Sequence, residues 1–482
     1  MVTAEAQSMA VRARGRGYEL QLDVDDARNH PLSIFRQCWS AYAKAQEGLR
    51  HDKSAQWRNP GERVQLSAVV KPWTGLQLAK RRYPKGFQAA LVFTDHADQS
   101  SAARLAALMF GEGRDKPPHA PKQPRRGFAT HGLGMSKSVY ARGGAFKQLD
   151  GPDYRVLVHR LLRETQGRIE IGPHSTSGRR ESRLSALKDL RDFQSLDARF
   201  WIDHQPSTNC EAITNQGADE TTIYHITDVL GHYGYDYVWS GLDRRQSKGS
   251  LNLFQPKRSA QHQPILFQHS RVDGKRRGLW LFSSVWAAHD FSEFLRRYGP
   301  KRLEALEEEH GIHIAHTYLD TYLTGGAMKN WTLLQRVPGG FRLQDKAERL
   351  FRGLAARQAR GDLWVAGIVA VGDHLIGMAD VRIDSMADGS FLLHHRGDRN
   401  LSGATFSISR QAGRPYMNDR PLPQTQSRTT PQDNQRWFWF DLEAGQTVRL
   451  HFPEAGAVPR PATAQGSRLL WTEPPTGLLR GP

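Results

Sequence analysis

Cysteine is almost absent from this chain of 482 residues, in which Cys38 and Cys210 are the only two. So few cysteines exclude a framework of several disulfides and a zinc site built from cysteine thiolates. The composition fits a reducing compartment. Because no secretory signal is visible, we expect a cytoplasmic location for the chain as written, with an association with the cell envelope left open.

Long hydrophobic runs are also missing, since no stretch approaches the roughly 20 apolar residues that a membrane-spanning helix needs. Hydrophobic residues make up 38% of the chain and charged residues 24%, which is typical of a soluble globular protein. Acidic residues are the scarcer charge, with 49 against 67 basic residues and a net charge of +18. An excess of this size can favour binding to nucleic acid or to an anionic surface, but a solvated arginine-rich surface is the simpler interpretation.

The pattern of apolar and polar residues changes several times along the chain. Strand and helix patterns alternate over residues 86–345, which predicts a parallel-stranded α/β domain, either an open sheet or a barrel. The other expected segments are a mixed α/β lead-in over 1–85, a linking helix over 346–360, a β-sandwich-like domain over 361–456 and a disordered tail over 457–482. The first strand of the β-domain is expected in LWVAGIVAV, residues 363–371.

Polar side chains follow the expected parallel strands at the points where these strands end. They are Asp95, His96, Asp98, His174, Asp203, His204, Trp239 and His316. In parallel α/β domains the functional groups gather beyond the carboxyl ends of the strands. Histidines and carboxylates hold a divalent metal, which lowers the pKa of bound water and polarises a carbonyl, while a further carboxylate and histidine act as base and acid. Such ligands suit zinc, iron, cobalt and manganese alike.

The order of these motifs resembles that of the polysaccharide deacetylases over about residues 87–319. The first family motif is a strand ending in Thr-Phe-Asp-Asp-Gly; VFTDHAD (92–98) is similar, with His96 in place of the second Asp. The second motif is His-Ser/Thr-x-x-His; EIGPHSTSGR (170–179) is similar, with Gly178 in place of the second His. The resemblance implies a distorted (β/α) barrel and metal-dependent removal of N- or O-acetyl groups from glycans.

The resemblance also implies roles for single residues. Asp95 would be the catalytic base, and His316 would assist the leaving group. The expected metal ligands are His96, Asp98, His174 and His204, with zinc as the first expectation and iron, cobalt or manganese as alternatives. By the resemblance, Arg199 and Trp239 are expected substrate contacts. His131 is a further expected contact that does not come from the resemblance, because it lies in a segment (130–140) interpreted as a lid or substrate loop.

Each of these residues also has a structural interpretation. Asp95 could cap the helix that follows it, His316 could be a buried histidine bonded to a carbonyl, and Trp239 could be part of the core. At the level of the whole chain, two alternatives to a glycan deacylase stay open. One is a glycan-binding or scaffold protein without catalysis, favoured by the missing second histidine. The other, less favoured, is a nucleic-acid-binding protein acting through Arg125, Arg126, Arg244 and Arg245.

Overall fold

The computed structural model describes most of the chain beyond residue 75. The described residues are 76–124, 126–143, 148–178, 183–206, 209–243, 250–254, 265–268, 279–288, 290–323, 331–430 and 434–453, with four earlier strands, β1 (Ser8–Arg14), β2 (Gly17–Asp23), β3 (Ser33–Ile34) and β4 (Arg50–His51). The tail expected over 457–482 lies outside these residues, as do Arg125, Arg244 and Arg245.

A sheet of parallel strands forms the centre of the protein. Its strands follow in the order β10 (Phe200–Trp201), β11 (Tyr237–Asp243), β13 (Trp280–Trp286), β14 (Ile312–Thr317), β6 (Ala89–Asp95), β8 (Met135–Val139) and β9 (Ile169–Pro173). A parallel bridge between His174 and Ile202 joins the two ends of this order, and the N–H of Ile202 donates to the carbonyl of Pro173 at 3.1 Å. The sheet is therefore nearly closed and compatible with the expected (β/α) barrel.

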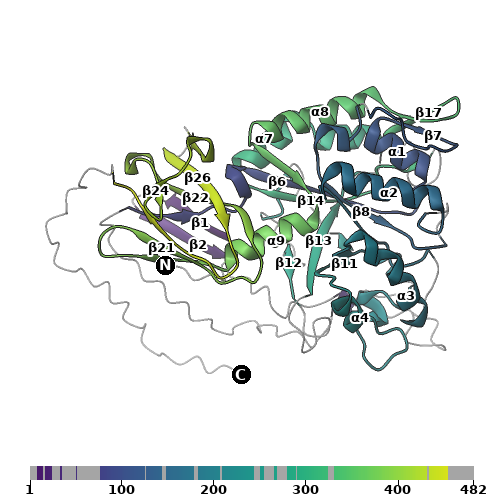
Figure 1. Ribbon diagram of the computed structural model, residues 1–482, viewed down its shortest axis with the longest axis horizontal. Helices are drawn as coiled ribbons and strands as arrows, with labels where there is room; N and C mark the ends of the chain where they lie inside the picture. The colour runs from purple at the N-terminus through teal and green to yellow at the C-terminus, as the bar shows by residue number, and fades with distance from the viewer. Residues whose placement is uncertain are drawn as a thin grey trace, which may run out of the picture.

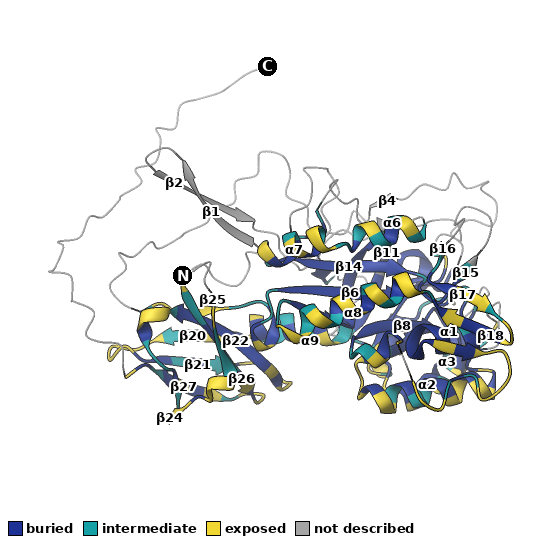
Figure 2. Cartoon of the chain, turned by 90° about the horizontal axis from the view of Figure 1, so that it is seen from above, coloured by how far each residue is buried: buried dark blue, intermediate teal, exposed yellow. Residues whose placement is uncertain are grey.

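Helices cover the outside of this sheet (Figure 1). They are α1 (Ala102–Phe110), α2 (Pro152–Thr165), α3 (Arg183–Leu190), α4 (Thr227–His232), α6 (Phe291–Arg297), α7 (Pro300–Glu308) and α8 (Asp345–Ala359). Side chains alternate between the two faces of β6: Leu91 and Phe93 join the core under the helices, whereas Ala90 and Val92 join the core inside the barrel. Figure 2 shows the result, with buried strands enclosed by helices whose outer faces are exposed.

Shorter strands attach to this barrel. β12 (Leu266–Phe267) pairs antiparallel with β13, and β19 (Leu363–Ala366) pairs parallel with β6. A three-stranded antiparallel sheet lies against α1 and contains β7 (Glu112–Arg114), β17 (Leu334–Val337) and β18 (Gly340–Leu343). A further pair is β15 (Tyr322–Leu323) with β16 (Trp331–Thr332).

The strand predicted over 363–371 is wrong in its second half. Only β19 is a strand, and it belongs to the central sheet; the chain then enters helix α9 (Ile368–Ala379). The Glu170 carboxylate of β9 accepts the N–H groups of Val369 (3.0 Å) and Ala370 (2.9 Å), which fixes the first turn of α9. This tertiary contact outweighs the low helix propensity of the Ile and Val residues.

Two antiparallel sheets share one hydrophobic core; their strands follow α9, except for β5, which precedes the barrel. One contains β20 (Val381–Ser385), β21 (Phe391–His395), β27 (Thr447–His451), β23 (Tyr416–Met417) and β24 (Arg420–Pro421); the other contains β25 (Ser427–Thr430), β26 (Gln435–Leu442), β22 (Leu401–Ser409) and β5 (Ala79–Lys80). Phe391 and Val448 of the first sheet and Phe406 and Phe438 of the second lie in that core. That these sheets form a separate β-sandwich-like domain over 361–456 stays a prediction.

Two further observations concern the environment of the protein. Within the described part of the chain, no helix has both the length and the apolar character needed to cross a bilayer. Cys210 is disulfide-bonded, and the one other cysteine of the chain, Cys38, lies outside the described residues. A disulfide is more typical of an oxidising compartment than of a reducing one, and the compartment of this protein stays a prediction.

Candidate metal centre and active site

Four histidines meet at the barrel mouth, the edge at which the parallel strands end. His96 follows β6, His174 follows β9, His204 follows β10, and His316 lies at the end of β14. Their ring centroids are 4.9 Å apart for His96 and His174, 5.1 Å for His174 and His204, and 3.8 Å for the stacked pair His96 and His316. Strands far apart in the sequence thus deliver the four imidazoles to one place, as the strand-end rule predicts.

The carboxylate of Asp98 lies between two of these rings. Its Oδ2 is 3.2 Å from Nε2 of His174, and its Oδ1 is 3.2 Å from Nε2 of His204. Its side chain is 29% exposed, whereas all four histidines are buried, so the group reaches solvent through Asp98. His96, Asp98 and His174 each offer a ligand atom, and these atoms lie within 4.8 Å of one another. This His/Asp/His group could hold a metal ion.

The donor atoms fit such an ion. Two ligands bound at 2.0–2.1 Å with a tetrahedral angle between them are about 3.4 Å apart. The two contacts of Asp98 with His174 and His204 measure 3.2 Å. Nε2 of His96 is buried and has no hydrogen-bond partner in the part of the chain that the structure describes, which is unusual for a polar atom and suits a metal ligand.

The electrostatics of the group favour the same use. Burial lowers the pKa of His96 well below its ordinary value, and burial lowers that of His174 to about 4 although Asp98 opposes the shift. For Asp98, burial would raise the pKa, but the neighbouring His174 and His204 outweigh it and hold the pKa below its ordinary value. At neutral pH His96 and His174 are therefore neutral and Asp98 is ionised, the protonation states that metal binding requires.

His316 belongs to a second set of polar contacts at the mouth. Its Nδ1 is 2.9 Å from Oδ2 of Asp243, the last residue of β11, and its Nε2 is 3.2 Å from the hydroxyl of Tyr318. Ser284 donates to the other oxygen of Asp243 at 2.8 Å and accepts the indole N–H of Trp239 at 2.8 Å. The expected substrate contact Trp239 thus lies beside the histidines, but it is buried and binds Ser284.

Aromatic residues that sequence reasoning missed surround the same mouth. Tyr140 and Tyr318 interact with the Asp98 carboxylate; burial first and then this carboxylate raise the pKa of both phenols, so both keep their protons at neutral pH. The ring of Trp286, at the end of β13, lies 4.8 Å from that of His316. Tyr140 was missed because β8 was interpreted as a loop, and Trp286 and Tyr318 follow the same strand-end rule that found the histidines.

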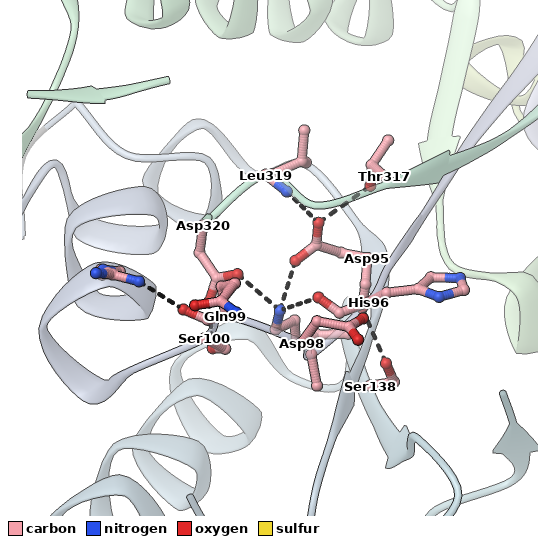
Figure 3. A network of polar contacts seen from close by, with 12 residues as sticks. Asp95, His96, Asp98, Gln99, Ser100, Ser138, Thr317, Leu319 and Asp320 are labelled. Carbon is pink, nitrogen blue, oxygen red and sulfur yellow. Dashed lines mark hydrogen bonds and ion pairs between the residues drawn. The ribbon is translucent and has the colours of Figure 1, made fainter. Parts of the chain in front are cut away.

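Asp95, the expected base, lies in a different network. Lys137 donates to its Oδ2 at 2.6 Å, while Thr317 (3.1 Å) and the N–H of Leu319 donate to its Oδ1. Figure 3 shows this carboxylate turned toward Thr317 and Leu319, with the His96 ring extending away from it. Lys137 also donates to Asp320 at 2.9 Å, and all three charged groups are fully buried. Burial raises the pKa of Asp95, and Lys137 opposes the shift.

Two expected substrate contacts lie away from the mouth. His131 precedes β8 and contacts Glu348 of α8 at 3.6 Å. Arg199 precedes β10 and binds Asp236 at 2.5 Å and Asp373 of α9 at 2.7 Å. Both residues stand where strands begin, and parallel strands place their beginnings at the opposite end of the barrel. Asp203 also faces away from the histidines, because its oxygens accept the Trp201 indole N–H (2.7 Å) and the Ile213 N–H (3.0 Å).

Comparison with known proteins gives distant likenesses. No family model matches the sequence, and no curated protein matches it. A probable polysaccharide deacetylase from Pseudomonas aeruginosa PAO1 is 10% identical, with a TM-score of 0.33 over 61% of this chain and 93% of that one. The 4-alpha-glucanotransferase from Thermococcus litoralis is 14% identical, with a TM-score of 0.31, and the match covers 60% of this chain and 40% of that one. Alpha-galactosidase I from Mortierella vinacea is 9% identical, with a TM-score of 0.22 over 75% and 86% of the two chains. The resemblance to deacetylases has distant structural support only.

Proposed function

We propose that the protein is a metal-dependent hydrolase that removes N- or O-acyl groups, acetyl above all, from a polysaccharide or related glycan. The observation that carries the proposal is the convergence of His96, Asp98 and His174 within 4.8 Å, with His204 on the other oxygen of Asp98. A divalent ion held there would polarise an acyl carbonyl and lower the pKa of the attacking water. Zinc is our first expectation, with iron, cobalt or manganese as alternatives.

The residues around the ligands support a glycan as substrate. The rings of Trp286 and Tyr318 are partly exposed at the mouth, with their centroids 5.6 Å apart. Partly exposed aromatic rings suit sugars, because they offer an apolar face to the pyranose ring. His316 lies beside both rings, where a leaving group of the sugar would be within its reach.

One observation favours the alternative of a glycan-binding protein without catalysis. Asp95, at the position that the family uses for its base, has both oxygens engaged by Lys137, Thr317 and Leu319. A carboxylate held in this way is not available to take a proton from water. The two functions share the fold and differ in whether an acyl group is released.

Metal content and acetate release separate these possibilities. We expect the full-length protein, loaded with zinc or cobalt and dialysed, to retain about one ion per chain by elemental analysis, and His174→Ala and His96→Ala to retain much less. His131→Ala is the matched control, since this histidine lies at the other end of the barrel. Acetate release from an N-acetylated chitin tetramer or an O-acetylated xylan oligosaccharide, abolished by a chelator, would support the hydrolase. Bound metal without release from any acylated glycan would favour the binding protein, and no bound metal in the unaltered chain would overturn both the metal site and the hydrolase.

A further inference from the structure

The site needs a group that takes a proton from water, and the alternation of side chains in β6 excludes Asp95 from that role. Leu91 and Phe93 face the helices, and Asp95 lies two residues further along the same face. Its partner Lys137 likewise follows Met135 and precedes Val139, which both belong to the core under the helices. The Asp95–Lys137 pair is therefore on the outer side of the sheet, with both charges fully buried.

A different carboxylate, imidazole and hydroxyl stand in line at the mouth. Asp243 holds Nδ1 of His316 at 2.9 Å, which leaves Nε2 as the nitrogen that faces the hydroxyl of Tyr318 at 3.2 Å. Ser284 fixes Asp243, and the stacked His96 ring and the Trp286 ring fix the plane of His316. The phenol of Tyr318 also interacts with Asp98, so it lies next to the expected metal ligands. A base oriented by a carboxylate and bonded to a hydroxyl is the arrangement that activates hydroxyl groups in hydrolases generally.

We infer that Asp243, His316 and Tyr318 form the proton-transfer chain of this site, with the Tyr318 phenol as the group that meets the substrate. The inference rests on the proposed acyl hydrolysis and replaces Asp95 as the base. It also changes the expected role of His316, which acts through Tyr318 rather than directly on the leaving group.

The proton transfers balance over one reaction cycle. As a water molecule adds to the acyl carbonyl carbon, its proton passes to the Tyr318 oxygen, and the phenol proton passes to Nε2 of His316. Asp243 stabilises the imidazolium. When the carbon–nitrogen or carbon–oxygen bond of the tetrahedral adduct breaks, the proton returns from His316 through Tyr318 to the leaving nitrogen or oxygen. The acyl group leaves as the carboxylic acid, which contains the hydroxyl of the water, and the glycan leaves with the proton that His316 returned.

The chain also contains a matched control for this phenol and imidazole pair. On the outer face of β14, Nε2 of His313 is 3.2 Å from the hydroxyl of Tyr298, the same distance as in the pair at the mouth. Nδ1 of His313 faces the carbonyl of Leu251 rather than a carboxylate, at 2.9 Å. Tyr298→Phe therefore removes an equivalent contact outside the site.

Ring-nitrogen NMR of histidine-labelled, metal-free protein tests the chain without any substrate. We expect Tyr318→Phe to shift the Nε2 signal of His316 and leave that of His313 in place, while Tyr298→Phe does the reverse. Asp243→Asn should shift the Nδ1 signal of His316. If Tyr318→Phe leaves His316 unchanged, the proposed chain does not exist in solution, whatever the protein hydrolyses.

Turnover of 4-nitrophenyl acetate by the zinc-loaded full chain is the second arm. Tyr318→Phe should lower kcat on the order of 100-fold with KM changed less than about threefold, because the phenol acts in proton transfer rather than in binding. Tyr298→Phe should stay within about twofold of the unaltered protein in both constants. A kcat for Tyr318→Phe as high as that for Tyr298→Phe would overturn the inference. If the unaltered chain cleaves neither this ester nor an acylated glycan, the proposed function fails, and the NMR arm still decides whether the chain of contacts exists.

Discussion

Lys137 is the residue whose removal tests most directly how the barrel is held together below the site. Its ammonium group is fully buried and donates to Asp95 at 2.6 Å, to Asp320 at 2.9 Å and to the carbonyl of His96 at 3.1 Å. Lys137→Met keeps a flexible unbranched side chain but removes the positive charge. Two buried carboxylates would then face each other without a cation between them.

The expected loss is large because the remaining charges cannot reach water. Breaking a buried ion pair by removing one partner costs about 3–5 kcal/mol, a large share of the 5–15 kcal/mol that is typical of whole domains. Without Lys137, burial keeps the folded-state pKa of Asp95 above its unfolded value with no cation opposing the shift. Stability is then present at low pH and lost as the pH rises through the raised pKa, so the effect of the substitution should shrink on acidification.

Urea unfolding followed by tryptophan fluorescence measures this effect at about pH 7.5 and about pH 5. Lys188→Met, at an exposed position of α3, is the control and should change the free energy of unfolding by less than about 0.5 kcal/mol. A loss for Lys137→Met below about 1 kcal/mol at the higher pH, or an equal loss at both pH values, would refute the reasoning. Poor soluble expression of Lys137→Met would also indicate the larger loss of stability.

Two further predictions concern groups outside the mouth. Burial lowers the pKa of His313 to about 3 from 6.5, so its contribution to stability is present above pH 6.5 and is lost as the pH falls, at about 1.4 kcal/mol per pH unit. His313→Gln should therefore show a shallower loss of stability than the unaltered chain in urea titrations between about pH 7 and pH 4.5. Cys210 is disulfide-bonded, so iodoacetamide should label it only after reduction, as read by peptide mass spectrometry. Labelling of the denatured, unreduced chain would contradict that bond.

The site residues at strand ends were predictable because parallel strands share one direction. His96, Asp98, His174, His204 and His316 follow strands whose apolar runs are plain in the sequence, and the structure brings all five to the mouth. No spacing of residues in the sequence predicts that Asp98 lies between His174 and His204, because this position depends on how β9 and β10 meet in space. The family motif lacks its second histidine here, and the ligand set that takes its place stays a prediction.

The errors have physical causes that the sequence partly contained. β8 was hidden because its sequence, MSKSV, is polar; Lys137 can be buried there only because Asp95 of β6 and Asp320, in the turn after β14, contact its ammonium group. The Asp95 side chain points to the outer side of the sheet because it lies two residues after Phe93, and side chains alternate along a strand. The sequence contained this signal, but the family motif was given more weight. Arg199 and His131 precede their strands, so the strand-end rule does not place them at the mouth, and their role as substrate contacts stays a prediction. Helix α9 depends on the distant carboxylate of Glu170, which no local pattern reveals.

The junction between β9 and β10 has a consequence for the barrel as a whole. The single bridge of His174 and Ile202 joins these strands, and the two imidazoles on Asp98 come from the two sides of that junction. An ion bound by both would act as a clasp, so closing the ring of strands and loading the ion become one coupled equilibrium. Amide hydrogens at Ser175 and Ile202, whose bonds span the junction, would then exchange more slowly in the loaded protein than in the chelated one.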